Sequence, residues 1–217
     1  MRVITLYSGF NNVGGAQNVA LQIAVNVNND KPIVLSKTMP NNVDAKYKDV
    51  ADFRLLSFKQ IKHLADNETV FFSHHRKITT LLMLYKILLG DRLHIVHIAH
   101  STFDNLRFVS LFPNNIVAVS NGVKQNLINY FHRKPSNITV IYNGLSDKYT
   151  PKIYRNDGKI KILFVGRICG VKRQLDFVKY SKGKIPYNVE VLFAGKGEDE
   201  EALKREILDD SHYKYLG

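Results

Sequence analysis

The chain has 217 residues, of which 45% are hydrophobic and 23% are charged, a composition that supports a buried core and excludes a disordered or collagen-like chain. Its single cysteine, Cys169, excludes an internal disulfide framework and a cysteine-rich zinc module and predicts a reducing compartment, by default the cytoplasm. The apolar run at the N-terminus is too short for a signal peptide, and no stretch reaches the ~18 uncharged apolar residues of a membrane span.

The formal charge of +12 favours a polyanionic partner, such as nucleic acid, anionic lipid or a phosphorylated substrate. Residues 1–157 contain 19 basic and 10 acidic side chains and residues 158–217 contain 12 and 9, so most of the excess lies in the first part. We expect any anionic surface to meet that part. Nucleic acid is not expected, because the basic residues are dispersed and no helix-turn-helix, zinc-finger or RNP signature accompanies them.

Short apolar runs rich in β-branched and aromatic residues alternate with longer stretches of helical periodicity. In the first part the predicted strands are Arg2–Tyr7, Pro32–Ser36, Phe53–Leu56, Thr69–Ser73, His94–Ile98, Ile116–Val119 and Thr139–Tyr142. The predicted helices are Gln17–Asn28, Phe58–Ala65, Lys77–Leu89 and Asn121–Phe131. This alternation predicts an α/β fold in which a parallel sheet is covered on both faces by right-handed crossovers.

A polar segment without periodicity then interrupts the alternation and is predicted to be a linker. The predicted elements after it are a strand at Lys161–Val165, a helix at Arg173–Lys182, a strand at Val189–Ala194, a helix at Asp199–Asp209 and a strand that begins at Tyr213. The chain thus divides into a domain at 1–143, a linker at 144–157 and a second domain at 158–217. The second domain holds about half of a doubly wound fold, so we expect the chain to be truncated.

A glycine-containing loop from Ser8 to Gln17 follows the first strand and runs into a helix. Gly14 and Gly15 permit close backbone approach to a ligand, and the amides of a helix N-terminus favour anionic or strongly polar groups. The dinucleotide pattern G-x-G-x-x-G and the P-loop pattern are both absent. A ligand-binding loop and an ordinary strand-to-helix turn are therefore equal alternatives.

Histidines follow two of the predicted strands. His100 and Ser101 stand at the carboxyl end of HIVHIA, and His74 and His75 follow TVFFS, where open α/β sheets place their ligands. An imidazole at such a place is suited to hydrogen-bond a substrate hydroxyl or to accept a proton, although a loop histidine satisfied by the backbone is the commoner case. Metal binding is not predicted, because histidines three apart in a strand point to opposite faces.

In the second domain, the first strand leads into a loop with Gly166 and Arg167 and, five residues further on, Lys172. An arginine fork, a lysine point charge and helix amides together suit a diphosphate. Solvated surface cations are the alternative. Gly195 and Gly197 lie in a second loop of the same kind, and the lone cysteine of the first loop is predicted to be incidental.

Seven segments together resemble the retaining glycosyltransferases of family 4, whose GT-B architecture has two Rossmann-like domains. GGAQ is similar to the N-terminal Gly-Gly-x-Glu loop, HIAHS to the strand that ends in a functional histidine, and IVAVSNGVKQNL to "vSxxxxxxl". VIYNGLSDKYTP resembles the hinge "ipNGvDxxxFxP", FVGRICGVKRQLDF the "vGRlxxxKGxxxll" motif, FAGKGEDEEAL the "xxGxGpxxxxL" loop, and YKYLG the strand "vxflG". They occur in the family's order over residues 1–217, which is more specific than any one motif.

The resemblance implies that residues 1–143 bind the acceptor and that the nucleotide-sugar domain begins near residue 158. Family members transfer a sugar, here of hexose type, with retention from a UDP- or GDP-sugar and without a metal or other cofactor. The implied acceptor is a glycan or a lipid-linked sugar in bacterial cell-surface polysaccharide or lipopolysaccharide synthesis. The basic first domain predicts a peripheral position on the anionic inner face of the membrane.

Carried over residue by residue, the resemblance implies that Arg167 and Lys172 hold the donor diphosphate and stabilise its departing charge. His100 lies beside the transferred sugar, and Gly15, preceded by Gly14, approaches the donor phosphate. The loops around the donor contain Gly166, Gly195 and Gly197. The residues expected on the acceptor side are His74, His75, Ser101 and Ser120.

The sequence also departs from the family pattern. Gln17 replaces the usual Glu, Leu145 and Ser146 replace the "vD" of the hinge, and the later Glu-x7-Glu segment, which grips the ribose and the donor sugar, has no counterpart. We expect this chain to be inactive alone. A non-catalytic partner subunit that keeps the acceptor domain is the alternative function.

Overall fold

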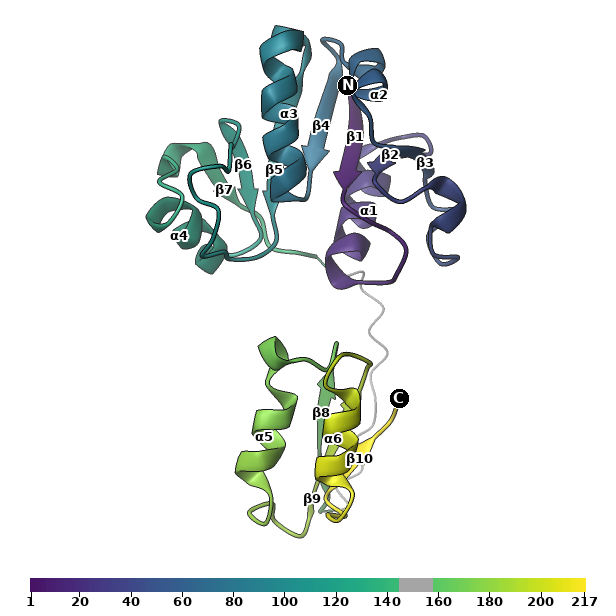
Figure 1. The fold of residues 1–217 in the computed structure, drawn as a ribbon, viewed down its shortest axis with the longest axis vertical. Helices are drawn as coiled ribbons and strands as arrows, with labels where there is room; N and C mark the ends of the chain where they lie inside the picture. The colour runs from purple at the N-terminus through teal and green to yellow at the C-terminus, as the bar shows by residue number, and fades with distance from the viewer. Residues whose placement is uncertain (145–157) are drawn as a thin grey trace. The chain divides into compact units, whose positions relative to one another are not determined.

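The computed structural model describes residues 1–144 and 158–217, so the predicted linker at 144–157 lies, apart from its first residue, outside the described residues. The chain divides into two compact units between Ser146 and Asp147. Figure 1 shows a sheet with packed helices in each of them.

The first unit contains a seven-stranded sheet in which every neighbouring pair is parallel. The strands are β1 (Arg2–Tyr7), β2 (Ile33–Ser36), β3 (Asp52–Leu55), β4 (Thr69–Ser73), β5 (His94–Ala99), β6 (Asn115–Ala118) and β7 (Ile138–Val140). The helices are α1 (Gly15–Val27), α2 (Phe58–Leu64), α3 (Arg76–Leu89) and α4 (Asn121–Asn129), with 3-10 turns η1 (Pro40–Asn42), η2 (Gly90–Arg92) and η3 (Pro135–Asn137). The predicted strands and long helices all form, with ends within two residues of the predicted ones.

The strand order β3-β2-β1-β4-β5-β6-β7 reverses its direction of growth between β1 and β4. β1 pairs with β2 on one side and with β4 on the other, where Leu6 lies opposite Ser73. Open α/β sheets bind ligands at the carboxyl ends of the two strands that flank such a switch point. The topology therefore directs attention to the loops that follow β1 and β4.

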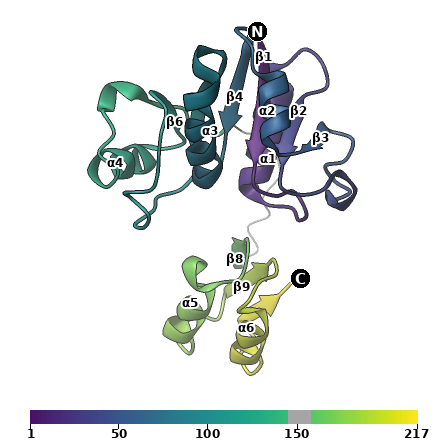
Figure 2. The ribbon, with the colours of Figure 1, turned by 45° about the horizontal axis from the view of Figure 1, so that its top comes forward.

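Helices cover both faces of this sheet, because alternate side chains along each strand point to opposite sides. On one face, Ile4 and Phe71 pack with α2 and α3, and Ile116 packs with α4. On the other face, Val34 packs with Leu21 of α1. Figure 2 shows α2 and α3 together on the first face, so the predicted two-sided α/β architecture is confirmed.

Local signals begin and end the helices of the first unit. The Oγ atoms of Ser57 and Ser120 accept hydrogen bonds from the amides of Gln60 and Val123, each at 3.2 Å, and such N-caps contribute about 1 kcal/mol each. Gly90 ends α3 with a φ of 58°, which glycine adopts without a Cβ penalty.

The second unit contains a three-stranded parallel sheet in the order β10-β9-β8. Its elements are β8 (Ile160–Val165), η4 (Gly170–Lys172), α5 (Gln174–Ser181), β9 (Val189–Ala194), α6 (Glu200–Ile207) and β10 (Tyr213–Tyr215). Phe193 of β9 packs with Val178 of α5 and Leu203 of α6 on one face. Val165 of β8 points to the opposite face and is 75% exposed, so this sheet is covered on one side by its own helices.

Candidate functional site

A small cavity lies at the switch point of the first unit. It has a volume of about 210 Å³, and its lining includes Tyr7, Ala16, His74, His75, His100 and Ser101. Three neighbouring strands contribute their carboxyl ends to it, because Tyr7 ends β1, His74 follows β4 and His100 follows β5. The arrowheads of β1 and β4 in Figure 1 point to this edge, where α1 and α3 begin. The histidines that follow two different strands therefore share one cavity.

His74 and His100 form a direct imidazole pair in this cavity. The Nδ1 atom of His74 lies 2.9 Å from Nε2 of His100, and the two ring planes are 17° apart. Burial lowers the pKa of both rings, and the nearby His100 and His97 lower the pKa of His74 further. Because both pKa values are lowered from the ordinary 6.5, both rings are neutral near pH 7, and one of the two facing nitrogens donates its proton to the other.

The surroundings of His74 favour one of the two tautomer arrangements. Its Nε2 atom is buried and has no hydrogen-bond partner within the described part of the chain. An unpaired buried N–H is less well tolerated than an unpaired acceptor, which favours a proton on Nδ1 of His74 and a bare Nε2. His100 then accepts at Nε2 and carries its own proton on Nδ1.

His97 also lines the cavity, but it is almost fully buried and its ring is engaged within the core. Its Nδ1 atom lies 2.7 Å from Oγ1 of Thr79 and 3.1 Å from the carbonyl oxygen of Ser73. Because a carbonyl oxygen only accepts, Nδ1 carries the proton. Burial lowers the pKa of His97 to about 3, against the opposing effect of the Ser73 hydrogen bond. The neutral ring of His97, in β5, therefore hydrogen-bonds the last residue of β4, next to His74 in the sequence.

His75 and Tyr7 bring two more polar groups to the cavity. His75 is the residue before α3, and its Nδ1 atom is buried without a partner among the described residues. Burial lowers the pKa of His75, and Lys77, Lys37 and Arg76 lower it further. The ring of Tyr7 meets that of His75 edge-on at 6.5 Å, and burial raises the pKa of Tyr7. Both side chains are neutral at pH 7 and suited to hydroxyl groups.

Arg76 fixes the loop that follows His100, a role that the sequence analysis missed. Its guanidinium donates to the carbonyl oxygen and to Oδ1 of Asn105, both at 2.6 Å. The same group lies 4.4 Å from the ring centroid of Phe103 and 5.4 Å from that of Phe131. A buried arginine with a two-point hydrogen bond and two aromatic neighbours holds this loop against α3. No local spacing indicated this, because Arg76 and Asn105 meet only after folding.

The loop before α1 is anchored at one end and open at the other. Phe10 is buried against Tyr47 and Phe53, and the amide of Gly14 donates to the hydroxyl of Tyr47 at 3.3 Å. Gly15, the first residue of α1, has no atom within 4 Å of the position of an added Cβ, and no side chain caps this helix. The N-terminus of α1 thus presents unpaired amides, as anion-binding helix ends do.

The two predicted serines occupy different places. Ser101 lines the cavity beside His100. Ser120 is the N-cap of α4, with its Oγ atom engaged by the amide of Val123. Ser120 therefore has a structural role that the sequence analysis did not include, and its contact with an acceptor stays a prediction.

Glycines hold two loops of the second unit together. A Cβ atom at Gly195 would lie 2.1 Å from the carbonyl oxygen of Gly166, and one at Gly197 would lie 2.1 Å from that of Ile168. The amide of Ile168 donates to the carbonyl of Lys196 at 3.1 Å, which joins the same two loops. Close contact between the two backbones thus explains why glycine occupies positions 195 and 197. Gly166 differs, because it has a φ of 144° and open space at its Cβ position.

Arg167 and Lys172 extend from a loop whose backbone is fixed. Both side chains are exposed, and the ion pairs among the described residues of this unit involve other cations. The carbonyl oxygen of Arg167 accepts a hydrogen bond from Nε2 of the buried Gln174 at 3.1 Å. Cys169 is buried, which agrees with an incidental role. The two cations therefore remain available to an anion.

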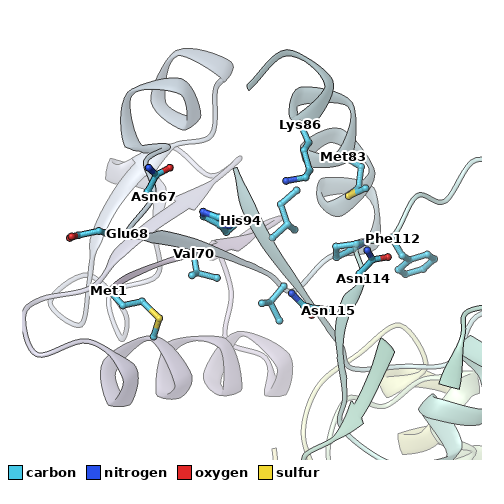
Figure 3. A pocket seen from close by; sticks show the side chains of 13 residues that line it. Met1, Asn67, Glu68, Val70, Met83, Lys86, His94, Phe112, Asn114 and Asn115 are labelled. Carbon is cyan, nitrogen blue, oxygen red and sulfur yellow. The ribbon is translucent and has the colours of Figure 1, made fainter. Parts of the chain in front are cut away.

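A larger depression, of about 690 Å³, lies at the opposite edge of the first sheet. Figure 3 shows the side chains that line it, among them Val70, His94 and Asn115 from the amino ends of β4, β5 and β6. The ammonium group of Lys86 donates to the carbonyl oxygen of Leu93 at 2.8 Å. Because open α/β sheets bind ligands at their carboxyl ends, the smaller cavity is the better candidate site.

The predicted site residues form two groups. His74, His75, His100 and Ser101 meet in the cavity of the first unit, and Arg167 and Lys172 share one loop of the second. Within residues 1–144 and 158–217, no three His, Cys, Asp or Glu side chains are arranged to hold a metal ion. Over the same residues, no helix has both the length and the apolar character needed to cross a bilayer.

The sequence matches no family model and no curated protein. Solved structures, however, share the fold over the whole chain. HepE from Anabaena, in complex with UDP, matches with a TM-score of 0.80 and 15% identity over 100% of this chain and 69% of HepE. The lipopolysaccharide outer core galactosyltransferase WaaB, in its apo form, matches with a TM-score of 0.72 and 14% identity over 100% and 68% of the two chains.

A glycosyltransferase from Rickettsia africae matches with a TM-score of 0.69 and 16% identity, again over 100% of this chain and 68% of that one. The chain thus spans about two thirds of the length of these proteins. At such low identities the similarity establishes the fold. The chain has the α/β fold of the GT-B glycosyltransferases, with a seven-stranded Rossmann-like unit followed by a three-stranded one.

Proposed function

We propose that this chain provides the acceptor side and part of the donor side of a retaining glycosyltransferase of the family-4 type. The proposed reaction transfers a hexose from a UDP- or GDP-sugar to a glycan or a lipid-linked acceptor of a bacterial cell surface. The observation that carries the proposal is the neutral His74–His100 pair in a cavity at the β1/β4 switch point. Support comes from the fold, which the chain shares with a galactosyltransferase and with a protein in complex with UDP.

In this proposal residues 1–143 bind the acceptor and His100 lies beside the transferred sugar. Sugars present many hydroxyl groups and no charge, so neutral imidazoles recognise them without the cost of desolvating an ion. The proton on Nδ1 of His100 is donated to a sugar hydroxyl oxygen. His75 and Ser101 add further hydrogen-bonding groups to the same cavity, and Tyr7 adds a phenol.

Residues 158–217 contribute the phosphate-binding cations in this proposal. When the bond between the sugar and the diphosphate breaks, negative charge grows on the departing phosphate oxygen. Arg167 and Lys172 stabilise that charge, because a guanidinium fork and an ammonium group both pair with phosphate oxygens. The unpaired amides at Gly15 provide a second phosphate contact of the kind found at helix N-termini. The donor itself is the only small molecule required, without a resident cofactor.

Calorimetric titration of the chain with UDP, UDP-glucose and GDP-mannose tests the donor part of this proposal. We expect one nucleotide to bind, and we expect Arg167→Ala combined with Lys172→Ala to weaken its binding at least tenfold, the loss of about 1.4 kcal/mol or more. Lys179→Ala combined with Arg205→Ala is the matched control, because it removes two other exposed cations of the same unit. Equal binding by both double variants, or no binding at all, would refute the phosphate assignment.

The sugar-transfer assay tests the alternative function. Because we expect this chain to be inactive alone, nucleotide binding without transfer to lipid-linked or glycan acceptors fits both the enzyme and a non-catalytic partner subunit, and only observed transfer distinguishes them. Transfer that His100→Ala reduces at least a hundredfold, while His94→Ala leaves it unchanged, would support the enzyme. His94 is a suitable control because it is an exposed histidine at the amino end of the same strand.

A further inference from the structure

His74 lines the cavity, but neither of its ring nitrogens is open to a ligand. Its Nδ1 atom is engaged by Nε2 of His100 at 2.9 Å, and its Nε2 atom is buried without a partner among the described residues. The residue as a whole is 5% exposed. His100 is partly exposed, and its Nδ1 atom is the ring nitrogen that stands outside the pair. His74 therefore acts on a ligand through His100.

The surrounding main chain holds His74 in a fixed place. Its amide donates to the carbonyl oxygen of Leu6 in β1 at 3.0 Å. The preceding Ser73 accepts at Oγ from Oγ1 of Thr79 in α3 at 2.8 Å, and at its carbonyl oxygen from Nδ1 of His97 in β5 at 3.1 Å. Contacts with two neighbouring strands and a helix thus fix this point of the chain. A side chain on such a rigid support is suited to orient a neighbouring side chain.

The geometry of the pair fixes the ring of His100. The two ring planes are 17° apart, and the centroids are 5.2 Å apart. The nitrogen–nitrogen distance and the two ring radii together account for this separation, which places both nitrogens close to the line between the centroids. The N–H bond and the lone pair of an imidazole lie in the plane of the ring, so nearly coplanar rings give a well-aligned hydrogen bond. This bond therefore selects one ring orientation of His100.

The burial of His74 determines which ring of the pair donates. If His100 donated from Nε2, the neutral His74 would carry its own proton on Nε2, where it would be buried without an acceptor. A buried donor without a partner costs more than a buried acceptor without one. His74 therefore donates from Nδ1, and His100 keeps its proton on Nδ1. The polar group that His100 offers outside the pair is an N–H and not a bare nitrogen.

We propose that His74 is a positioning residue, which acts through His100 by fixing its ring plane and its Nδ1–H tautomer. The cavity then offers a hydrogen-bond donor at this position. It selects a ligand group with a free acceptor, such as a hydroxyl, ether or carbonyl oxygen, over an ammonium group, which only donates. This role differs from the direct acceptor contact that the family resemblance implies for His74. The inference deepens the proposed function and rests on it for the ligand, whereas the tautomer is a property of the ligand-free chain.

Nuclear magnetic resonance of the ligand-free chain tests the tautomer directly. In the chain labelled with isotopic nitrogen at histidine, long-range proton–nitrogen correlations at pH 7 show which ring nitrogens carry protons. The His100→Ala variant identifies the signals of His100 by their loss. We expect His100 to be protonated at Nδ1 and bare at Nε2. A proton on Nε2 of His100, or a spectrum that averages the two tautomers, overturns the proposal.

Two variants of nearly equal size separate positioning from simple packing. His74→Asn keeps an N–H donor near the place of Nδ1, so His100 should retain its wild-type tautomer. His74→Asp puts a carboxylate there, which only accepts, so the proton of His100 should move to Nε2. His94→Asn is the matched control, because His94 is an exposed histidine at the amino end of β5. The same tautomer in folded His74→Asn and His74→Asp overturns the proposal, and the wild-type spectrum decides it alone if either variant fails to fold.

Calorimetric titration connects the tautomer to the ligand. For UDP-glucose or GDP-mannose, the affinity divided by that of the free nucleotide isolates the contribution of the sugar. We expect His74→Asp to lower this ratio about three- to tenfold, the value of one hydrogen bond, and His74→Asn to preserve it. Equal ratios in the wild type and both variants would overturn the effect on ligand selection. If no nucleotide binds, the donor proposal fails, and the tautomer measurements decide this inference by themselves.

Discussion

The Nδ1 atom of His74 lies 2.9 Å from Nε2 of His100, although 26 positions separate the two residues. Each ring follows a different strand, and β4 and β5 are parallel neighbours in the sheet. The carboxyl ends of the two strands therefore coincide in space. Burial lowers the pKa of both rings, which keeps the pair uncharged at the place where the topology favours a ligand.

Replacing His100 should raise the pKa of His74. Burial is the largest cause of the lowered pKa of His74, and the neighbouring His100 is the second. His100→Ala removes the second cause and reduces the first, because water enters the space that the imidazole leaves. Ring proton chemical shifts measured against pH by NMR report the change. His94→Ala, which removes an exposed histidine, should leave the pKa of His74 where it is. An unchanged value in His100→Ala would contradict the pairing.

Acid should destabilise the protein through His97. Its pKa falls from the ordinary 6.5 to about 3 in the folded chain, so between these values the unfolded chain binds a proton that the folded chain does not. The free energy of unfolding should be unaffected by this residue above about pH 6.5 and should fall by about 1.4 kcal/mol for each pH unit below it, down to about pH 3. Urea unfolding at pH 7, 6, 5 and 4 measures the slope.

His97→Gln should make that slope shallower, because the titrating ring is gone. His63→Gln, at an exposed histidine, is the matched control. Identical slopes in all three proteins would show that His97 titrates normally in the fold.

Removing the side chain of Arg76 should release the loop after β5. Two hydrogen bonds from a charged donor and two aromatic contacts are lost, and we expect Arg76→Ala to lower the free energy of unfolding by about 3 kcal/mol. Urea unfolding and limited proteolysis between residues 103 and 111 check this. Arg76→Lys should not rescue it, because an ammonium group lacks the planar fork. Arg92→Ala, at an exposed arginine, should behave like the wild type.

A methyl group at Gly195 should disrupt the second unit. The added Cβ would lie 2.1 Å from the backbone carbonyl oxygen of Gly166, and Gly195 has a φ of 134°. We expect Gly195→Ala to cost at least about 3 kcal/mol, because backbone atoms cannot move aside as a flexible side chain does. Gly170→Ala in the adjacent loop meets nothing within 4 Å and serves as the control. Amide hydrogen exchange should show lower protection of β8 and β9 in Gly195→Ala than in Gly170→Ala. Similar protection in the two variants would argue against the predicted clash with Gly166.

The sequence was sufficient for the secondary structure and the fold class. Apolar runs, the serine caps at Ser57 and Ser120 and the glycine stop at Gly90 act over a few residues, so they are visible in a linear sequence. The regular alternation of strands and helices implied a parallel sheet, and that topology placed the histidines that follow its strands at the same end of the sheet. His74, His75, His100 and Ser101 accordingly line one cavity.

Only the tertiary structure determined which contacts each histidine makes. His97 and His100 come from the same short run and both line the cavity, yet Nδ1 of His97 is engaged by Thr79 whereas His100 pairs with His74. The contacts of Arg76 with Asn105 and of Gly195 with Gly166 could not be predicted from the sequence either. In each pair the two residues are 29 positions apart and come together only when loops that follow different strands pack against each other. Sequence spacing determines which elements form, whereas burial and contacts between distant loops determine the charge state and the function of each side chain.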